Sequence, residues 1–475
     1  MALLKVFRAQ IKAPDMIQTK LQPFWPIIAM TALFLTAVFF RPLLPIDETR
    51  YMTVAWEMWL RGDWFGPLTL NFEPYHHKPP LLFWLINDTW SIFGVSRWAG
   101  LLPVVFAATG CVYFTQIFAQ ELFKAEKLEF KTLPFLMTGS VPFLIYSTLV
   151  MFDVTLTLFV LLALLALIAF ANDRRPVFIL GMALAMGLGV LTKGPVAWLY
   201  VIFPVLFAPF WLDGHKKWLS WYGGCGLAFI LSTIPVLLWL IPVLKASNPD
   251  FAFSLIWEQT AGRISGNMEN AHTRPVYFYL PLLPVLFLPW AFFPSFWTGL
   301  GSVKNSFKTN PALRFLACWI IPVVLGFSFI GGKQPHYLVP LLPGVLIFIA
   351  YTMSMKPARI RAVSVAMVAL IITGQIAASQ TIFKKYDLQP IADYVSQHEN
   401  KDCAFVRKYQ GELTFLGRLH HHMDDRTFEN IEEWFHSHPN GIAVIRYHKP
   451  TEVNDFNMVM SIPYRGKNIG IFEKP

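Results

Sequence analysis

Long apolar stretches alternate with short polar connections over the first 380 residues of the chain. Runs close to the thickness of a bilayer predict membrane-spanning helices. The first run lacks a small-residue cleavage site and many others follow it, so we expect an uncleaved helix rather than a signal peptide. We expect about eleven membrane helices, at 24–40, 97–118, 132–150, 154–171, 177–192, 195–211, 219–243, 276–298, 312–330, 337–355 and 362–380.

Two further segments, 48–62 and 81–93, have a different pattern. Polar residues interrupt their apolar positions at roughly helical spacing, namely Glu57, Arg61, Asn87 and Asp88. A helix with such a mixed face is typical of the membrane surface. We therefore predict that both segments lie along the outer interface and cover a pocket there.

The tail of the chain, 381–475, carries another pattern. Short alternating runs at 403–409, 411–417, 441–447 and 469–474 predict strands, and residues 430–438 predict a helix. The fold expected is an α-helical polytopic membrane protein with interfacial helices, 1–380, followed by a small soluble α/β domain of about 90 residues, 381–475.

Composition agrees with a membrane protein. Hydrophobic residues make up 55% of the 475 residues and charged residues only 14%, which is more apolar surface than a water-soluble core can bury. The four cysteines show no CxxC or other metal-binding spacing, so they are expected to be inert.

Basic residues are concentrated in every second connection. They lie in 124–131, 172–176, 213–218, 304–308 and 356–361, and in the segment before the first helix. By the positive-inside rule these connections face the cytoplasm, which places the N-terminus inside and the C-terminal domain in the periplasm. The net charge of +10 is thus explained by topology, and no nucleic-acid partner is expected.

The opposite connections contain acids, bases and histidines from widely separated parts of the chain. These are "IDETRY" at 46–51, "YHHKPP" at 75–80, "MFDVT" at 151–155, "LTKGP" at 191–195, 257–275 and "GGKQPHY" at 331–337. Ionised groups near a membrane are costly unless they are paired or hydrated. Their convergence on one face therefore predicts a functional site.

Several of these motifs carry a family resemblance. "IDETRY", "HHKPPLLFWL", "FGVSRWAGLLP", "LTKGP" and "KQPHYLVPLLP" resemble the integral-membrane glycosyltransferases of the GT-C type, which include the protein O-mannosyltransferases and, more closely, the lipid A aminoarabinose transferases. The resemblance covers about 20–380 and is weak over the tail. It implies a bacterial inner-membrane enzyme that takes a sugar from a polyprenyl (undecaprenyl) phosphate and transfers it to an acceptor outside the cytoplasm.

The resemblance implies a catalytic base and a set of cations. Asp47 matches the acid in the first outer loop and is the candidate base, and Lys78, Lys193 and Arg263 are candidate partners of the donor phosphate. Arg50 either binds phosphate or holds Asp47 in place.

Other residues are expected to orient the substrate. Asp153 matches the acid of the second outer loop and is grouped with the catalytic residues, since it could orient a cation or the sugar. Tyr337, His336, His77 and Glu48 are further candidates for contacts with the phosphate or the sugar.

Each of these residues also has a simpler interpretation. Asp47 and Glu48 could merely complement the dipole of an interfacial helix, and Asp153 could cap a helix. Lys78, Lys193 and Arg263 could anchor the chain at the membrane surface.

His77 departs from the family pattern. Aminoarabinose transferases carry a carboxylate just before the lysine, and such a group could recognise an amino sugar or bind a cation. The departure leaves the identity of the transferred sugar open. His76 and His77, with Glu258 or His272, could instead bind a divalent metal such as zinc. A run of three histidines, 420–422, is expected to be a solvated loop of the tail.

The sequence therefore favours an inverting glycosyltransferase that uses a polyprenyl-phosphate sugar and modifies lipid A, another envelope glycan or a protein. The alternative is a transporter or flippase of a lipid-linked glycan. Transporters place polar residues near the midplane and show repeated halves, whereas these polar residues gather at one surface. A sensor that uses the tail as receptor would not explain the polar residues of the membrane part.

Overall fold

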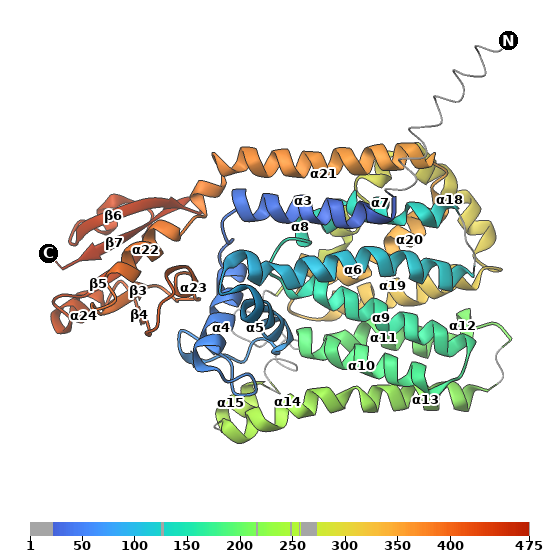
Figure 1. The fold of residues 1–475 in the computed structure, drawn as a ribbon, viewed down its shortest axis with the longest axis horizontal. Coiled ribbons are helices and arrows are strands. Elements are labelled where there is room, and N and C mark those ends of the chain that lie inside the picture. Colours follow the sequence, from blue (N-terminus) through green and yellow to red (C-terminus); the bar gives the residue numbers. More distant parts are fainter. Residues whose placement is uncertain are drawn as a thin grey trace, which may run out of the picture.

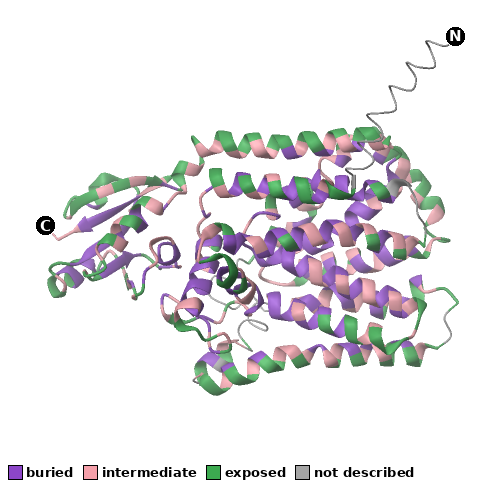
Figure 2. Cartoon of the chain, viewed as in Figure 1, coloured by how far each residue is buried: buried purple, intermediate pink, exposed green. Residues whose placement is uncertain are grey.

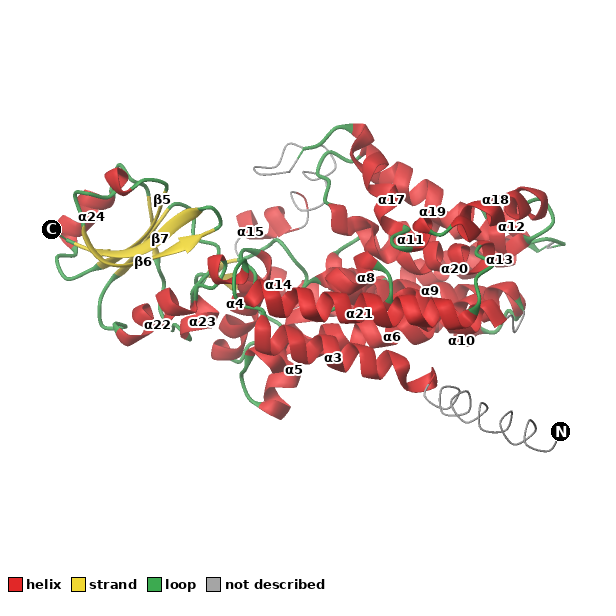
Figure 3. Ribbon diagram, turned by 90° about the horizontal axis from the view of Figure 1, so that it is seen from above, coloured by secondary structure: helices red, strands yellow, loops and turns green. Residues whose placement is uncertain are grey.

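A computed structural model describes residues 22–124, 128–214, 217–247, 249–255, 257 and 273–474. Long helices run side by side in a bundle, and a smaller domain built on a β-sheet lies beyond one end of it (Figure 1). The same arrangement is seen from above, where the sheet follows the end of the bundle that holds α4 (Figure 3). The coarse prediction of a helical membrane protein with a sheet-containing C-terminal region is confirmed.

The helical part contains the following elements in chain order. They are η1 (Gln22–Phe24), α3 (Trp25–Phe40), α4 (Asp47–Arg61), the hairpin β1 (Thr69–Leu70) and β2 (Glu73–Pro74), α5 (Leu81–Phe93), α6 (Arg97–Phe123), η2 (Leu128–Thr132), α7 (Leu133–Thr138), α8 (Val141–Tyr146), α9 (Phe152–Asn172), α10 (Pro176–Lys193), α11 (Val196–Leu206), α12 (Ala208–Trp211), α13 (Trp218–Leu231), α14 (Thr233–Ala246), α15 (Pro249–Phe253), η4 (Val276–Leu282), α17 (Leu283–Leu286), η5 (Trp290–Phe292), α18 (Pro294–Ser306), α19 (Pro311–Phe329), η6 (Pro335–Leu341), α20 (Leu342–Thr352) and α21 (Pro357–Ser379).

Seven helical segments of the described residues are long and apolar enough to cross a membrane. They are Arg97–Phe123, Phe152–Asn172, Pro176–Lys193, Trp218–Ala246, Pro311–Phe329, Pro335–Thr352 and Pro357–Ser379. Trp25–Phe40, Val196–Leu206 and Val276–Leu286 are apolar but shorter. The expected number of eleven is therefore not confirmed.

Proline accounts for two of the differences between the predicted and the observed membrane helices. The segment 132–150 was expected as one helix, but it is divided into the short helices α7 and α8, each with a proline in its first turn. The segment 276–298 is likewise divided into η4, α17, η5 and the start of α18. Proline lacks the amide hydrogen of a helical hydrogen bond, and its ring clashes with the preceding turn. A prediction from hydrophobic length alone therefore makes these helices too long.

Local sequence signals start several of the long helices. Ser96 caps α6 by accepting a hydrogen bond from the Ala99 amide at 3.3 Å. The Asn310 carboxamide does the same for α19, with Pro311 at the first helical position.

The outer helices expose apolar side chains. Leu219 on α13, Leu238 on α14 and Leu370 on α21 are 90%, 67% and 61% exposed, and Figure 2 shows these outer faces in green around a buried interior. A water-soluble protein rarely exposes so much contiguous apolar surface, whereas lipid tails accept it.

The two predicted interfacial segments are helical, as α4 and α5. Both lie at the end of the bundle next to the sheet domain (Figure 1), and Gly62, with φ +63°, ends α4 in the left-handed conformation that glycine adopts without strain. Their position relative to a membrane stays a prediction.

The C-terminal domain comprises η7 (Phe383–Lys385), α22 (Gln389–Gln397), β3 (Cys403–Val406), α23 (Thr414–Gly417), β4 (Asp424–Arg426), α24 (Ile431–Ser437), β5 (Ile442–Tyr447), η8 (Pro450–Glu452), β6 (Asn457–Tyr464) and β7 (Lys467–Glu473). The sheet has the order β4-β3-β5-β7-β6, with β3 parallel to β4 and β5 and the other pairs antiparallel.

The sheet has a helix on each face. Phe405 of β3 packs in one cluster with Ile391 of α22, whereas its neighbour Val406 packs in another with Trp434 of α24. Successive side chains of a strand point to opposite faces, so the apolar runs of the sequence supply both layers. The division of the chain near residue 380 remains our proposal.

Three predicted strands and the predicted helix of this domain are confirmed, but the strand at 411–417 is wrong. Residues 414–417 form α23, because the Tyr409 hydroxyl accepts hydrogen bonds from the amides of Leu413 and Thr414 at 3.0 and 2.8 Å and turns the chain there.

The C-terminal domain contacts the helical part through α4, α5 and the β1-β2 hairpin. Trp56 on α4 donates its indole hydrogen to the Leu419 carbonyl at 3.0 Å, and Trp90 on α5 stacks on Phe415 at 5.4 Å between ring centroids. Asn71 exchanges two hydrogen bonds with the backbone of Met423. These contacts place the C-terminal domain directly on the helix that begins with Asp47.

Candidate functional site

Glu48 lies inside the protein and is fully engaged. Its carboxylate accepts hydrogen bonds from Arg41 Nη1 at 2.6 Å and Nη2 at 3.3 Å, from the Leu44 amide at 2.9 Å and from the Val150 amide at 2.8 Å. The side chain is 2% exposed, and Arg41 also donates to the Thr148 carbonyl at 2.6 Å. This geometry favours a structural role over the substrate contact expected for Glu48.

Asp47, the adjacent residue, has the opposite environment. It is the first residue of α4 and its side chain is 52% exposed. Arg50 Nη1 lies 3.9 Å from its Oδ1 atom, and the Tyr51 hydroxyl donates a hydrogen bond to the same oxygen at 3.4 Å. Two residues of the same helix therefore position the Asp47 side chain, which stays accessible to a reactant.

Tyr51 is a site residue that the sequence reasoning missed. Burial raises the pKa of its hydroxyl well above the usual value, and the nearby Asp47 carboxylate adds to the rise. The group therefore stays protonated and donates a hydrogen bond to Asp47. The sequence contained one signal for this residue. Tyr51 follows Asp47 by four positions, and residues four apart share one face of a helix.

Asp153 and Lys193 form a buried ion pair between the start of α9 and the end of α10. Their side chains are 2% and 7% exposed. The Lys193 Nζ atom also lies 4.6 Å from the centre of the Tyr337 ring, a cation–π contact. Asp153 was expected to orient a cation or the sugar, and the pair with Lys193 favours the first of these roles.

Lys78 and His336 join this pair. His336 lies within electrostatic range of Asp153, Lys193, Lys78 and Asp47. The Lys78 ammonium is 5.7 Å from the centre of the Phe152 ring, one residue before Asp153. The structure thus brings together six of the predicted residues: Asp47, Lys78, Asp153, Lys193, His336 and Tyr337.

Two further tyrosines contact residues of this group. Tyr200 on α11 donates a hydrogen bond to the Tyr337 carbonyl at 2.7 Å, and Tyr146 on α8 lies 6.4 Å from His336 between ring centroids. Neither residue was singled out from the sequence, since both lie inside or beside apolar runs with no polar pattern.

The metal hypothesis remains a prediction. His76 and His77 stack on each other at 4.8 Å between ring centroids, and His77 also stacks on Tyr75. Glu258 and His272, like the phosphate candidate Arg263, lie outside the described residues. Within the described ranges no group of three or more histidine, cysteine, aspartate or glutamate side chains could hold a metal ion.

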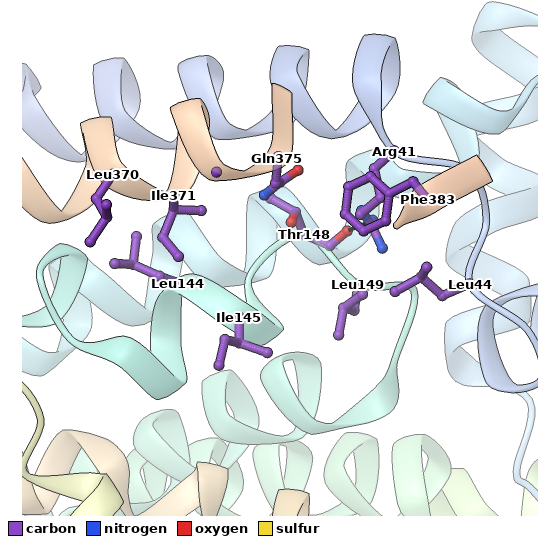
Figure 4. Close-up of a pocket in the computed structure, with 11 residues that line it drawn as sticks. Arg41, Leu44, Leu144, Ile145, Thr148, Leu149, Leu370, Ile371, Gln375 and Phe383 are labelled. Atoms are coloured by element: carbon purple, nitrogen blue, oxygen red, sulfur yellow. Dashed lines mark hydrogen bonds between the residues drawn. The ribbon is translucent and has the colours of Figure 1, made fainter. Parts of the chain in front are cut away.

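An apolar cavity of about 270 Å³ lies between α8 and α21, and Arg41, the partner of Glu48, is among the residues that line it (Figure 4). Its lining residues are Arg41, Leu44, Leu144, Ile145, Thr148, Leu149, Leu370, Ile371, Gly374, Gln375 and Phe383. Leu370 and Gly374 are also exposed on the outside of α21, so the cavity reaches the apolar surface of the bundle. Its chemistry suits a hydrocarbon chain.

The fold and the site together define a class of protein. Residues 77–239 match the family described as dolichyl-phosphate-mannose-protein mannosyltransferase. With the relatives described below, this match shows that the chain belongs to the superfamily of GT-C glycosyltransferases that includes the lipid A aminoarabinose transferases, which confirms the resemblance seen in the sequence.

Individual relatives are more specific. Over 311 residues the chain is 32% identical to an undecaprenyl phosphate-alpha-4-amino-4-deoxy-L-arabinose arabinosyl transferase of Pseudomonas paraeruginosa, which covers 63% of this chain and 54% of the relative. A second transferase of that name, from Pseudomonas fluorescens, is 30% identical over 68% of this chain and 59% of the relative. The chain thus matches little more than half the length of these curated relatives.

The solved structures of ArnT from Cupriavidus metallidurans share the fold. The structure bound to undecaprenyl phosphate has a TM-score of 0.72 at 19% identity and covers 94% of this chain and 96% of that one. The apo structure has a TM-score of 0.76 at 16% identity, with coverage of 96% and 98%. Coverage this high includes the C-terminal domain, where the sequence resemblance is weak.

Proposed function

We propose that the protein is a glycosyltransferase of the bacterial inner membrane that transfers a sugar from a polyprenyl phosphate to lipid A or another envelope glycan. The observation that carries this proposal is the meeting of an exposed carboxylate, Asp47, with the cations Lys78 and Lys193 at one end of an apolar bundle. The relatives named for undecaprenyl-phosphate sugar transfer support the donor class.

The proposed reaction is a single displacement at the anomeric carbon. Asp47 accepts the proton of the acceptor hydroxyl or phosphate group, the acceptor oxygen bonds to the sugar, and the bond from the sugar to the lipid phosphate breaks. The departing phosphate gains negative charge, which Lys78 and Lys193 stabilise. One displacement inverts the anomeric configuration.

The remaining candidates have supporting roles in this proposal. Asp153 holds Lys193 at the phosphate, and Tyr337 and His336 contact the phosphate or sugar beside it. Arg263 and His77 stay candidates for further donor contacts, and a divalent metal at His76 and His77 with Glu258 or His272 stays a separate hypothesis.

The proposed orientation follows from the basic connections, with the N-terminus in the cytoplasm and the C-terminal domain in the periplasm. The site then faces the periplasm, where lipid A is accessible. The polar residues gather at the end of the bundle where α4 and α9 begin and α10 ends, which favours the enzyme over the transporter or flippase.

Mass spectrometry of lipid A and envelope glycans tests the proposal. Cells that carry the gene should contain a species heavier by one sugar residue, and cells without it should lack that species. A flippase moves a lipid without changing its covalent structure. Identical masses in every envelope glycan of the two strains would therefore contradict the proposed activity.

The apolar cavity supplies a second test, because we propose that it holds part of the hydrocarbon chain of a lipid substrate. Gly374 on α21 lines the cavity, and a Cβ atom added there meets nothing within 4 Å. Gly374→Leu should therefore fold normally while it fills the cavity. We expect KM for the lipid substrate to rise roughly tenfold, since added side-chain atoms in an occupied apolar site cost on the order of 1–3 kcal/mol.

Gly223→Leu on α13 is the matched control. Gly223 is also an exposed helical glycine with nothing within 4 Å of an added Cβ, and it is not among the residues that line the cavity. Equal KM values for the two variants would exclude the cavity as a site for the lipid chain.

A further inference from the structure

A loop of the C-terminal domain is shaped to contact α4. Residues Tyr409–Phe415, here called the docking loop, lead from β3 into α23. Thr53 on α4 donates a hydrogen bond to the Gly411 carbonyl at 2.8 Å and accepts one from the Phe415 amide at 3.2 Å. Gly411 has φ +77°, and a Cβ atom there would lie 2.7 Å from the Leu70 side chain. The positive φ is a conformation that glycine adopts without strain, and any side chain here would also displace Leu70.

The docking loop carries a buried carboxylate to α4. Glu412 is 1% exposed, and its Oε2 atom accepts a hydrogen bond from the Gln410 amide at 2.6 Å. Its Oε1 atom lies 3.8 Å from Arg446 Nη1 and has no hydrogen-bond partner among the described residues. Burial raises the pKa of this carboxyl, while the charges of Arg446 and Arg50 favour its ionised form.

Arg50 precedes Thr53 by three residues on α4, so it shares the face of the helix that the docking loop contacts. It is within electrostatic range of Glu412, and its Nη1 atom is 3.9 Å from Asp47. That distance exceeds the length of a charge-assisted hydrogen bond, about 2.7–2.9 Å. The Nε atom of Arg50 is buried and makes no hydrogen bond within the described ranges. The guanidinium thus faces Asp47 at more than hydrogen-bond distance, and its charge adds to that of Arg446 around Glu412.

A hydrogen-bonded ion pair between Arg50 and Asp47 would oppose base catalysis by Asp47. A guanidinium hydrogen-bonded to a carboxylate occupies its lone pairs and stabilises its charged form, so the carboxylate accepts a proton less readily. Residues three apart on a helix are neighbours, and a second negative charge near Arg50 would reduce the net attraction between Arg50 and Asp47.

We infer that Glu412 is a positioning residue for the candidate site: it attracts Arg50 toward the C-terminal domain and leaves Asp47 free to accept a proton. The inference rests on the proposed function for its catalytic part. It also gives the C-terminal domain a role, because the domain supplies a charge to the end of the membrane bundle.

Glu412→Gln tests the inference in the full-length protein. We expect kcat for sugar transfer to fall about 10- to 100-fold, the scale on which a small displacement of a reacting group reduces a rate. KM for the donor should stay within about twofold. Glu412→Asp keeps the charge and should recover part of kcat. Glu399→Gln, which removes an exposed carboxylate of the same domain outside the docking loop, should leave kcat near that of the wild type.

A double-variant cycle with Arg50→Gln separates positioning from general damage. If Glu412 acts through Arg50, Glu412→Gln should have little further effect on kcat once Arg50 is gone. Multiplicative loss of kcat in the double variant would overturn the inference.

Melting temperatures of the same proteins in detergent give a readout that needs no substrate. We expect the two changes to be coupled, and additive changes in melting temperature would rule out the Glu412–Arg50 contact. A wild-type protein that transfers no sugar would contradict the proposed function, and the melting temperatures would still decide the contact.

Discussion

Asp47→Asn should lower the rate of sugar transfer by about 10²- to 10⁴-fold, the usual contribution of a general base. Asparagine keeps the size of the side chain and can still accept the hydrogen bond from Tyr51, but its carboxamide is not a base at neutral pH. Asp47 is half exposed, and asparagine can keep the hydrogen bond from the buried Tyr51 hydroxyl, so the substitution should not harm folding. The rate is measured as polyprenyl phosphate released by purified protein.

Asp88→Asn is the matched control for this change. Asp88 is an exposed residue on α5, the other predicted interfacial helix. Partial burial of its carboxyl raises the pKa of that group. The control should transfer sugar at the wild-type rate. If Asp47→Asn protein of normal melting temperature matches it, the base lies elsewhere, and Asp153 is the next candidate.

The sequence predicted the long helices because their signal is local. The expected helix at 154–171 is observed as Phe152–Asn172, and the interfacial segment 48–62 as Asp47–Arg61. Apolar length and polar spacing are properties of consecutive residues, so they need no knowledge of tertiary contacts. The prolines in 132–150 are local signals too, and they divide a segment that hydrophobic length alone predicts as one helix.

The buried ion pairs could not be derived in the same way. Arg41 and Glu48 are only seven positions apart. The remaining hydrogen bonds of the pair, from Arg41 to the Thr148 carbonyl and from the Val150 amide to Glu48, join residues more than one hundred positions apart. No periodicity links such positions. For that reason Glu48 was expected at the substrate, beside Asp47, whereas the fold turns it inward.

The convergence of the outer connections was predictable in outline only. Alternating basic loops indicated that Asp47, Lys78 and Asp153 share one face, but they could not show that Lys193 is paired with Asp153 or that His336 lies beside both. Pairing depends on how α9 and α10 pack. The docking loop was missed for a related reason, since its hydrogen bonds to Thr53 join residues more than 350 positions apart.

Lys193→Met should destabilise the protein strongly, because it leaves the Asp153 carboxylate buried without its closest cation. Both side chains are less than one-tenth exposed, and removal of one partner of a buried pair typically costs about 3–5 kcal/mol. Lys78 also lies within electrostatic range of Asp153, so we expect the lower end of that range. The measurement is the melting temperature in detergent.

The double variant Asp153→Asn, Lys193→Met separates stability from catalysis. With no ionised group left unpaired, most of the lost stability should return, because a buried ion pair can often be replaced by neutral groups at little cost. Sugar transfer should nevertheless stay about 10²- to 10³-fold below wild type, the loss expected when a group that stabilises developing charge is removed. Full recovery of transfer together with stability would show that the pair only holds α9 to α10. A Lys193→Met protein as stable as the wild type would instead show that the pair is not buried in the functional protein.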